Sequence, residues 1–275
     1  MIIKVLSENT SSMDSLGCEH GLSLYIKTNK HKVLFDTGAS SLFMQNAQKM
    51  RVDLSKVDIV VISHGHNDHA GGLETFLRIN KTAKIYLQEK AFGDYYSQRP
   101  DNEKKYIGID KNLFSHGQIV LVKDRLIIDD ELELFANVTQ NRLSPSGNKT
   151  LYKKEEGEFF PDDFLHEQNL VIREDDKIVL IAGCAHNGIV NILDCFYKEN
   201  GCMPTHVIGG LHLYNPAFKV NEDESVISEI AKQLLQSKAR FYTCHCTGVA
   251  PYEQLEEQMG SKNIAYLSTG NQLII

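Results

Sequence analysis

The sequence predicts a layered α/β fold, and three observations lead to this prediction. Short runs of β-branched and aromatic residues alternate with segments that have the apolar period of a helix. Several of these runs end next to a histidine or an aspartate. The composition, 42% apolar and 24% charged over 275 residues, is typical of a chain that folds throughout. Functional groups in layered α/β proteins collect at the carboxyl ends of strands, so we expect these residues to meet at one site.

Five predicted strands share this kind of ending. Each is four to seven residues long, and most are bounded by glycine or by a polar turn. The runs and the residues that follow them are 32–35 with Asp36, 58–62 with His64, 177–183 with His186, 205–210 with His212, and 240–243 with His245. One such ending could arise by chance, but five indicate that the strand ends converge.

Helical segments are predicted between the strands. They cover residues 42–50, 71–78, 188–197 and 221–236. Asn221 is the expected N-cap of the last one, because three acidic residues follow it and suit the positive end of the helix dipole. Gly71 and Gly72 are expected to let the chain turn into the second helix.

Two polar segments, 92–117 and 142–164, interrupt this alternation as insertions. We expect them to be irregular, and two interpretations remain open: lids or binding loops, or solvated surface excursions. No linker rich in proline, glycine or serine separates the rest of the chain. Residues 1–275 are therefore expected to form a single domain.

Charge and cysteine content narrow the partners and the compartment. The net charge is −7 and there is no basic stripe, so a small-molecule substrate is expected in preference to nucleic acid. No signal-like or membrane-spanning segment is apparent, which favours a cytoplasmic protein without membrane contact. The six cysteines are not expected to form a disulfide scaffold. Cys184 and Cys246 are interpreted as small buried residues, with Cys246 facing away from His245. The oligomeric state is left open.

The stretch VISHGHNDHAGGL, residues 61–73, carries the strongest chemical signal. Alternate residues of an extended segment share a face, so His64 and His66 can grip one metal ion. Asp68 and His69 come where the chain turns and can face an adjacent ion. Imidazole and carboxylate ligands suit zinc, with iron and manganese as alternatives. The spacing therefore predicts a site for divalent metal ions.

HGHNDH resembles the HxHxDH signature of the metallo-β-lactamase fold superfamily. LFDTG, GCAHNGIVNIL and TCHCTG resemble further superfamily motifs and follow in the same order, so the resemblance covers the chain from about residue 23 onward. It implies a four-layer αββα sandwich with a binuclear metal centre at one edge of the two sheets. The motifs also resemble a branch of metal-dependent hydrolases, whose members are often labelled dihydropterin–ribofuranosylaminobenzene-phosphate synthases.

The resemblance also assigns residues to roles. It implies two metal-binding sets, His64, His66 and His186 for the first ion and Asp68, His69 and His245 for the second. Asp36 is expected to orient a ligand histidine. Many relatives have a bridging aspartate after the next strand, where this chain has Leu211 and His212. His212 is left open as a ligand, a substrate-binding donor or a proton carrier. His20 and His166 are also open, between pocket and structural roles.

These features predict a metal-dependent hydrolase that uses a metal-activated hydroxide on a small phosphoester or ester. Asp68 and His212 are the expected catalytic residues, helped by backbone N–H groups at the start of helix 188–197. One alternative is a pterin-phosphate synthase or transferase of the methanopterin type. The other is a redox di-iron enzyme, which ranks last because such superfamily members have glutamate at the position of His66 and carry a flavin domain.

Overall fold

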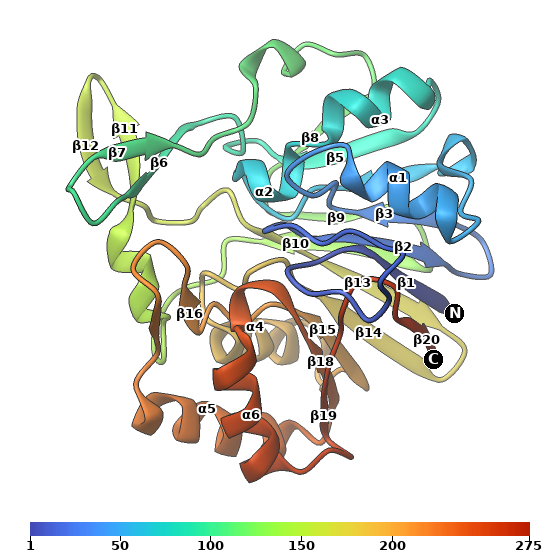
Figure 1. Ribbon diagram of the computed structural model, residues 1–275. Coiled ribbons are helices and arrows are strands. Elements are labelled where there is room, and N and C mark those ends of the chain that lie inside the picture. The colour runs from blue at the N-terminus through green and yellow to red at the C-terminus, as the bar shows by residue number, and fades with distance from the viewer.

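Two seven-stranded sheets lie face to face in the computed structural model, which describes residues 1–275 (Figure 1). The first sheet runs, from edge to edge, through β20 (Gln272–Ile274), β1 (Ile2–Ser7), β2 (Ser23–Lys27), β3 (Lys32–Phe35), β4 (Ile59–Val61), β5 (Lys84–Gln88) and β8 (Ile119–Val122). The second runs through β19 (Ile264–Tyr266), β18 (Arg240–Thr243), β15 (His206–Gly209), β14 (Lys177–Ile181), β13 (Gln168–Glu174), β10 (Leu132–Ala136) and β9 (Arg125–Ile127).

Helices cover the outer face of each sheet, which completes four layers (Figure 1). On the first sheet these are α1 (Leu42–Lys49), α2 (Asn67–Ala70) and α3 (Leu73–Ile79). On the second they are α4 (Ile189–Asn200), α5 (Glu224–Ser237) and α6 (Val249–Met259). Short 3₁₀ turns complete the set, η1 (Leu54–Lys56), η2 (Lys111–Leu113), η3 (Ser146–Thr150) and η4 (His245–Thr247). The predicted αββα fold is confirmed. No helix has the length and the apolar character that crossing a bilayer requires.

Three apolar cores hold the layers together. The inner faces of the two sheets bury side chains such as Phe35 and Ile172 against each other. A second core, which includes Phe76, lies between the first sheet and its helices, and a third, which includes Phe196 and Phe241, lies under α4–α6. Each sheet is therefore apolar on both faces, as expected for strands that are covered on two sides.

The parallel parts of the sheets bring the predicted strand ends to one edge. β3, β4, β5 and β8 pair in parallel, and so do β14, β15, β18 and β19. Parallel neighbours need crossover connections, and α1–α6 supply most of them. All five predicted strands exist, and their carboxyl ends point to the same side of the sandwich.

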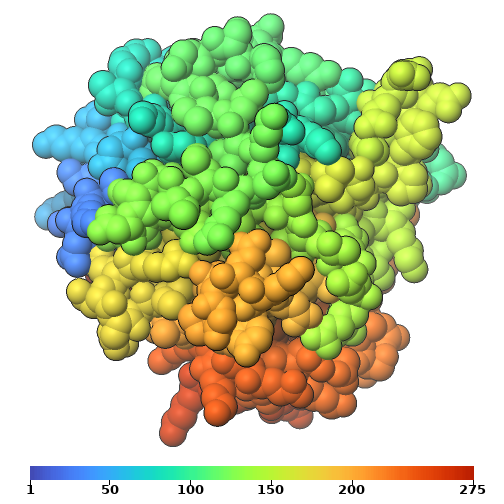
Figure 2. All heavy atoms as spheres, turned by 180° about the vertical axis from the view of Figure 1, so that it is seen from behind, coloured from blue at the N-terminus to red at the C-terminus, as the bar shows by residue number.

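The two insertions were expected to be irregular, and this prediction was wrong. They pair with each other in a third sheet of order β12 (Glu158–Pro161), β11 (Leu151–Glu155), β6 (Asp94–Gln98), β7 (Lys104–Tyr106). Tyr96 packs edge-on against Phe159 and Tyr106, and these aromatic contacts help to stabilise the small sheet. The β11–β12 hairpin stands out from the body of the molecule (Figure 2). A short ribbon of β16 (Tyr214–Asn215) and β17 (Val220–Asn221) completes the fold.

The N-cap predicted for α5 was also wrong. Asn221 lies in β17, and the helix is capped by Asp223, whose carboxylate accepts a hydrogen bond of 2.8 Å from the backbone N–H of Ser225. Asp223 occupies extended backbone, as an N-cap residue does. The β16–β17 ribbon competes for Asn221 and moves the start of the helix toward the C-terminus.

Gly71 and Gly72 serve close packing and not a turn with positive φ. Their φ angles are −63° and −82°, which any residue can adopt. A Cβ atom on Gly72 would lie 2.2 Å from the carbonyl oxygen of Thr37, and one on Gly71 would lie 2.3 Å from that of Ala39. The two glycines therefore let the end of α2 pack closely against the loop after β3.

We predict that Gly72→Ala lowers the free energy of unfolding by about 1–3 kcal/mol, because the added methyl group overlaps backbone that is fixed by the sheet. Urea denaturation of the metal-free protein measures the effect. Gly117→Ala is the control, since nothing lies within 4 Å of its Cβ position. A Gly72→Ala protein as stable as the wild type would contradict this explanation.

Candidate metal centre

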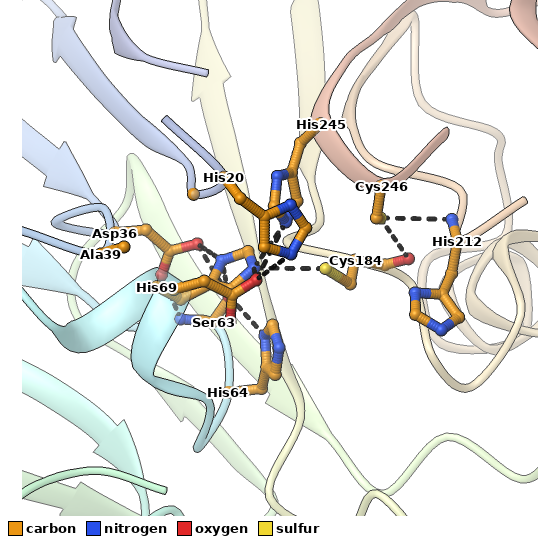
Figure 3. A network of polar contacts seen from close by, with 12 residues as sticks. His20, Asp36, Ala39, Ser63, His64, His69, Cys184, His212, His245 and Cys246 are labelled. Atoms are coloured by element: carbon orange, nitrogen blue, oxygen red, sulfur yellow. Dashed lines mark hydrogen bonds and ion pairs between the residues drawn. The ribbon is translucent and has the colours of Figure 1, made fainter. Parts of the chain in front are cut away.

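The strand-end residues converge on a cavity of about 350 Å³ at the edge of the two sheets. Figure 3 shows His64, His69 and His245 grouped around one point, although they come from different sheets. All five histidines of the predicted sets are buried, as is Asp36, whereas the side chain of Asp68 is 18% exposed. The residues of the two sets are His64, His66, Asp68, His69, His186 and His245.

The first set has nitrogen atoms without partners. Nε2 of His64, His66 and His186 is buried and accepts or donates no hydrogen bond. One ring nitrogen from each of these residues lies within 4.8 Å of the others. Nε2 of His66 also lies 3.7 Å from Oδ2 of Asp162, too far for a hydrogen bond. Buried polar groups are almost always paired, so three imidazole nitrogens that face one another without hydrogen bonds need a ligand that the protein does not itself supply.

The opposite ring nitrogens fix the tautomers in two of these residues. Ser63 donates its hydroxyl proton to Asp36 at 2.8 Å, so its oxygen accepts from Nδ1–H of His64 at 2.9 Å. Nδ1–H of His186 donates to the side-chain oxygen of Asn148 at 3.0 Å. In both residues Nε2 then carries a free lone pair directed into the site.

Burial further favours the neutral form of these side chains. It lowers the pKa of His64 and His186 well below the usual histidine range, and neighbouring imidazoles lower it further. A neutral imidazole is the form that binds a metal ion. The protonation state and the orientation of His64 and His186 thus both suit metal binding.

The second set is held just as closely. Nε2 of His69 lies 3.2 Å from Nε2 of His245, and Oδ2 of Asp68 lies 3.3 Å from the His245 atom and 3.7 Å from the His69 atom. Nδ1–H of His245 donates to the side-chain oxygen of Asn9 at 2.7 Å, which leaves its Nε2 free of a proton. Three donor atoms therefore face a common point.

The two carboxylates beside His69 favour a positive charge at this position. Burial lowers the pKa of His69, but the carboxylates of Asp36 and Asp68 outweigh it and raise that pKa to about 9. Nδ1–H of His69 donates to Oδ2 of Asp36 at 2.6 Å. Asp36 has a φ of 58°, an unusual conformation that aims its carboxylate at both Ser63 and His69. Asp36 thus lies behind His69, a candidate ligand, which is the kind of position that the sequence predicted for it.

Two histidines that the sequence left open lie at the site. Nε2 of His20 is 3.3 Å from Asp68, and its side chain is 46% exposed at the cavity rim. His166 is fully buried; it accepts the backbone N–H of Gly65 at 2.9 Å and pairs with Asp162 at 3.1 Å. His20 thus reaches the second set, while His166 supports the backbone between His64 and His66.

His212 also borders the cavity. Its ring centroid lies 4.3 Å from that of His186, and its buried Nδ1 has no hydrogen-bond partner. The N–H groups at the start of α4 were expected to join it there, and this prediction was wrong. None of residues 187–191 lines the cavity, because the backbone turns away and Glu167 accepts the N–H of Asn187 at 3.0 Å.

Two cysteines also lie at the site, where the sequence did not predict them. Cys184 and Cys246 are buried, as expected, but both line the cavity. Sγ of Cys184 lies 3.2 Å from Nε2 of His69. The chain around Cys246 is the 3₁₀ turn η4 and not a strand, so the alternation that was to direct this residue away from His245 does not apply. The position of Cys184 shortly after a strand was the sequence feature that could have predicted its place at the cavity.

The residues present fit divalent metal ions. Two neighbouring groups of imidazole and carboxylate donors face inward, and their outward nitrogens are fixed by Ser63, Asn148, Asp36 and Asn9. The orphaned Nε2 atoms of the first set are the observation on which this fit rests. A nitrogen-rich set with few thiols, open to a cavity, is typical of a catalytic metal site and differs from a closed structural one.

Comparison with known proteins agrees with this description. Residues 16–141 match the family model of the metallo-beta-lactamase superfamily. Tm1679, a metal-dependent hydrolase of the beta-lactamase superfamily with a known crystal structure, is 30% identical in sequence to this protein. The structural alignment covers 100% of this chain and 99% of Tm1679, with a TM-score of 0.82. The chain belongs to the metallo-beta-lactamase superfamily.

Other relatives extend the comparison. A 7,8-dihydropterin-6-methyl-4-(beta-D-ribofuranosyl)-aminobenzene-5'-phosphate synthase of Methanocaldococcus jannaschii is 26% identical over 264 residues, 90% of this chain and 87% of that protein. The protein MJ0448 of the same organism is 26% identical over 262 residues. The metallo-beta-lactamase fold protein YhfI from Bacillus subtilis shares the fold, with a TM-score of 0.57 at 12% identity.

Glu167 fixes the backbone that carries His186. Its buried carboxylate accepts the N–H of His186 at 2.6 Å, the N–H of Asn187 at 3.0 Å and the side-chain amide of Asn187 at 2.7 Å. We predict that Glu167→Ala lowers the free energy of unfolding of the metal-free protein by about 2–4 kcal/mol, because three buried donors lose their acceptor. Chemical denaturation measures this change.

Glu103→Ala is the matched control, since Glu103 is exposed and its carboxylate has no partner. It should change the stability by less than about 0.5 kcal/mol. Equal stability of the two variants would show that the contacts of Glu167 contribute nothing to the fold.

Proposed function

We propose that the protein is a binuclear metal-dependent hydrolase that acts on a small phosphoester. One observation carries the proposal: three buried imidazole nitrogens, from His64, His66 and His186, face one another without hydrogen bonds beside a cavity. In this proposal they hold one divalent ion, and Asp68, His69 and His245 hold a second. Zinc is the foremost candidate for this donor set, ahead of iron and manganese.

Divalent ions bound here would polarise the substrate and lower the pKa of a water molecule toward neutrality. The protein contributes orientation and proton handling. Asp68, which has a carboxylate oxygen in the cavity, would orient the attacking water. His212 lies beside His186 and would donate to, or accept a proton from, an oxygen of the reacting group.

Arg99 favours an anionic substrate over a neutral ester. It follows β6 on the first insertion and is the single lysine or arginine that lines the cavity. Its guanidinium forms no ion pair or hydrogen bond within the protein; only its backbone takes part, donating its N–H to the carbonyl of Glu103 and accepting the N–H of Asn102. A free guanidinium offers a planar pair of donors that matches a phosphate group. The proposal therefore places a phosphoester ahead of carboxylic esters.

Metal dependence is the first test. We expect about two zinc ions per chain after loading, and loss of phosphoesterase activity on chelation with recovery on adding zinc back. His186→Ala should lower kcat/KM by about 100-fold or more, since a metal site contributes several kcal/mol to catalysis. His116→Ala is the matched control, because this exposed histidine lies outside the cavity.

Full activity after exhaustive chelation would refute the metal-dependent mechanism. A stoichiometry of one zinc ion in the presence of excess metal would instead remove the role proposed for His245. Metal analysis and a panel of phosphomonoesters, phosphodiesters and neutral esters, measured on the same preparation, separate these cases.

The contribution of Arg99 can be measured separately. Arg99→Gln should lower kcat/KM for a phosphoester by about 10–100-fold, mostly through KM, because a charge-assisted hydrogen bond contributes roughly 1.5–3 kcal/mol. Hydrolysis of a neutral ester should not change. Lys104→Gln removes a positive charge from the same small sheet outside the cavity, where Lys104 lies over Tyr152, and should leave both rates alone. An equal loss on neutral esters would exclude anion recognition.

A second candidate is a pterin-phosphate synthase. It is favoured by the synthase of Methanocaldococcus jannaschii, which aligns with 90% of this chain. Such a reaction would release pyrophosphate from a pterin diphosphate. A pyrophosphate-release assay with pterin and aminobenzene substrates distinguishes it from the hydrolase, which would release no pyrophosphate under those conditions.

A further inference from the structure

Cys184 is placed differently from the other buried cysteines. It follows β14, two residues before His186, and is 3% exposed. Figure 3 shows its thiol directed at His69, with Sγ 3.2 Å from Nε2 of that ring. Cys244, in contrast, is packed in the apolar core between the two sheets. The sulfur of Cys184 therefore faces donor atoms of the site and not hydrocarbon.

The thiol also lies between the two metal-binding sets. Its sulfur is within 4.8 Å of a ring nitrogen of His64 in the first set and of His69 in the second. The same limit holds for His186 and for His245. Hence the sulfur is near both proposed ion positions, which is where a shared ligand has to be.

Cys246 is nearby but its sulfur is already engaged. Its Sγ accepts the backbone N–H of His212 at 3.3 Å and lies 3.6 Å from the carbonyl oxygen of Cys184. These backbone contacts hold the loops after β15 and β14 together. The sulfur of Cys184 has no such backbone partner; it contacts the ring of His69 and faces the thiol of Cys246.

We propose that the thiolate of Cys184 is a ligand of the metal centre, shared between the two ions. The inference rests on the proposed metal-dependent function. It would supply a negatively charged bridge that the end of β15 does not, since Gly209, Gly210 and Leu211 provide no carboxylate. Coordination would replace the thiol proton by metal and release that proton to solvent.

A thiolate ligand has consequences for metal choice. Sulfur is a soft donor that favours zinc or cobalt over manganese and magnesium. As a thiolate it also adds a negative charge to the centre, where Asp68 is the only other negatively charged ligand of the two proposed sets. Cys184 thus makes the centre more selective for zinc than histidine and aspartate alone would.

The test is spectroscopic and needs no substrate. The full-length protein is stripped of metal and loaded with Co(II), whose thiolate complexes absorb by sulfur-to-metal charge transfer in the near ultraviolet. We expect this band in the wild type, its loss in Cys184→Ser and Cys184→Ala, and its retention in Cys246→Ser. Cys202→Ser is the matched control, because Cys202 is exposed and lies outside the cavity.

X-ray absorption of the zinc-loaded wild type provides a measurement that does not depend on any variant folding. A sulfur scatterer at about 2.3 Å from zinc is expected, beside nitrogen and oxygen at about 2.0–2.2 Å. Only nitrogen and oxygen scatterers in the wild type would overturn the proposal. So would a charge-transfer band that survives in Cys184→Ser or disappears only in Cys246→Ser.

Failure of the cysteine proposal and failure of the metal centre give different results. If the wild type binds Co(II) and shows its ligand-field bands without charge transfer, the metal centre stands and the ligand role of Cys184 is refuted. If the wild type binds no Co(II) or zinc, both proposals are refuted together.

Discussion

The structure depends on keeping several imidazoles buried while their inner nitrogens stay unpaired. An unsatisfied buried polar atom costs about 1–3 kcal/mol, so the Nε2 atoms of His64, His66 and His186 destabilise the protein when nothing is bound to them. Two of the outer nitrogens are each fixed by a neighbouring side chain, which prevents the rings from rotating to find other partners. The fold thus maintains a site whose unfavourable energy a cation can relieve.

Both sheets and the N-terminal strand are needed to hold that arrangement. Asp36, Ser63 and His69 belong to the first sheet and its following loops, whereas His186 and His245 follow strands of the second. Glu8, directly after β1, accepts the N–H of His245 at 2.8 Å and the hydroxyl of Tyr266 at 2.7 Å. The two halves of the site are therefore fixed relative to each other by the core between the sheets and by buried hydrogen bonds across the edge.

The sequence predicted the parts of this site that depend on local pattern. Apolar runs with a histidine at their ends gave the strands, and parallel pairing then dictated that those ends meet. The roles of His166 and Arg99 could not be predicted, because they depend on contacts between distant segments. His166 contacts Gly65 across 101 residues, and Arg99 reaches the cavity only because β6 pairs with β11. Cys184 had the right position after a strand, but burial alone did not distinguish it from a core cysteine.

In the proposed function, metal binding and substrate choice are carried by different parts of the fold. The donor residues follow core strands whose positions are set by close packing, so a shift in any of them would disturb a sheet. Part of the opposite wall, with Ser97 on β6, Arg99 just after it and Leu151 on β11, comes from the small third sheet and its turns. Aromatic and cation–π contacts near the surface pack this sheet. The exposed β11–β12 hairpin can change without moving the donors, whereas Asn148, just before β11, orients His186. The proposal therefore locates the residues that decide between substrates on β6, β11 and the turns beside them, and the residues that hold the ions at the ends of the core strands.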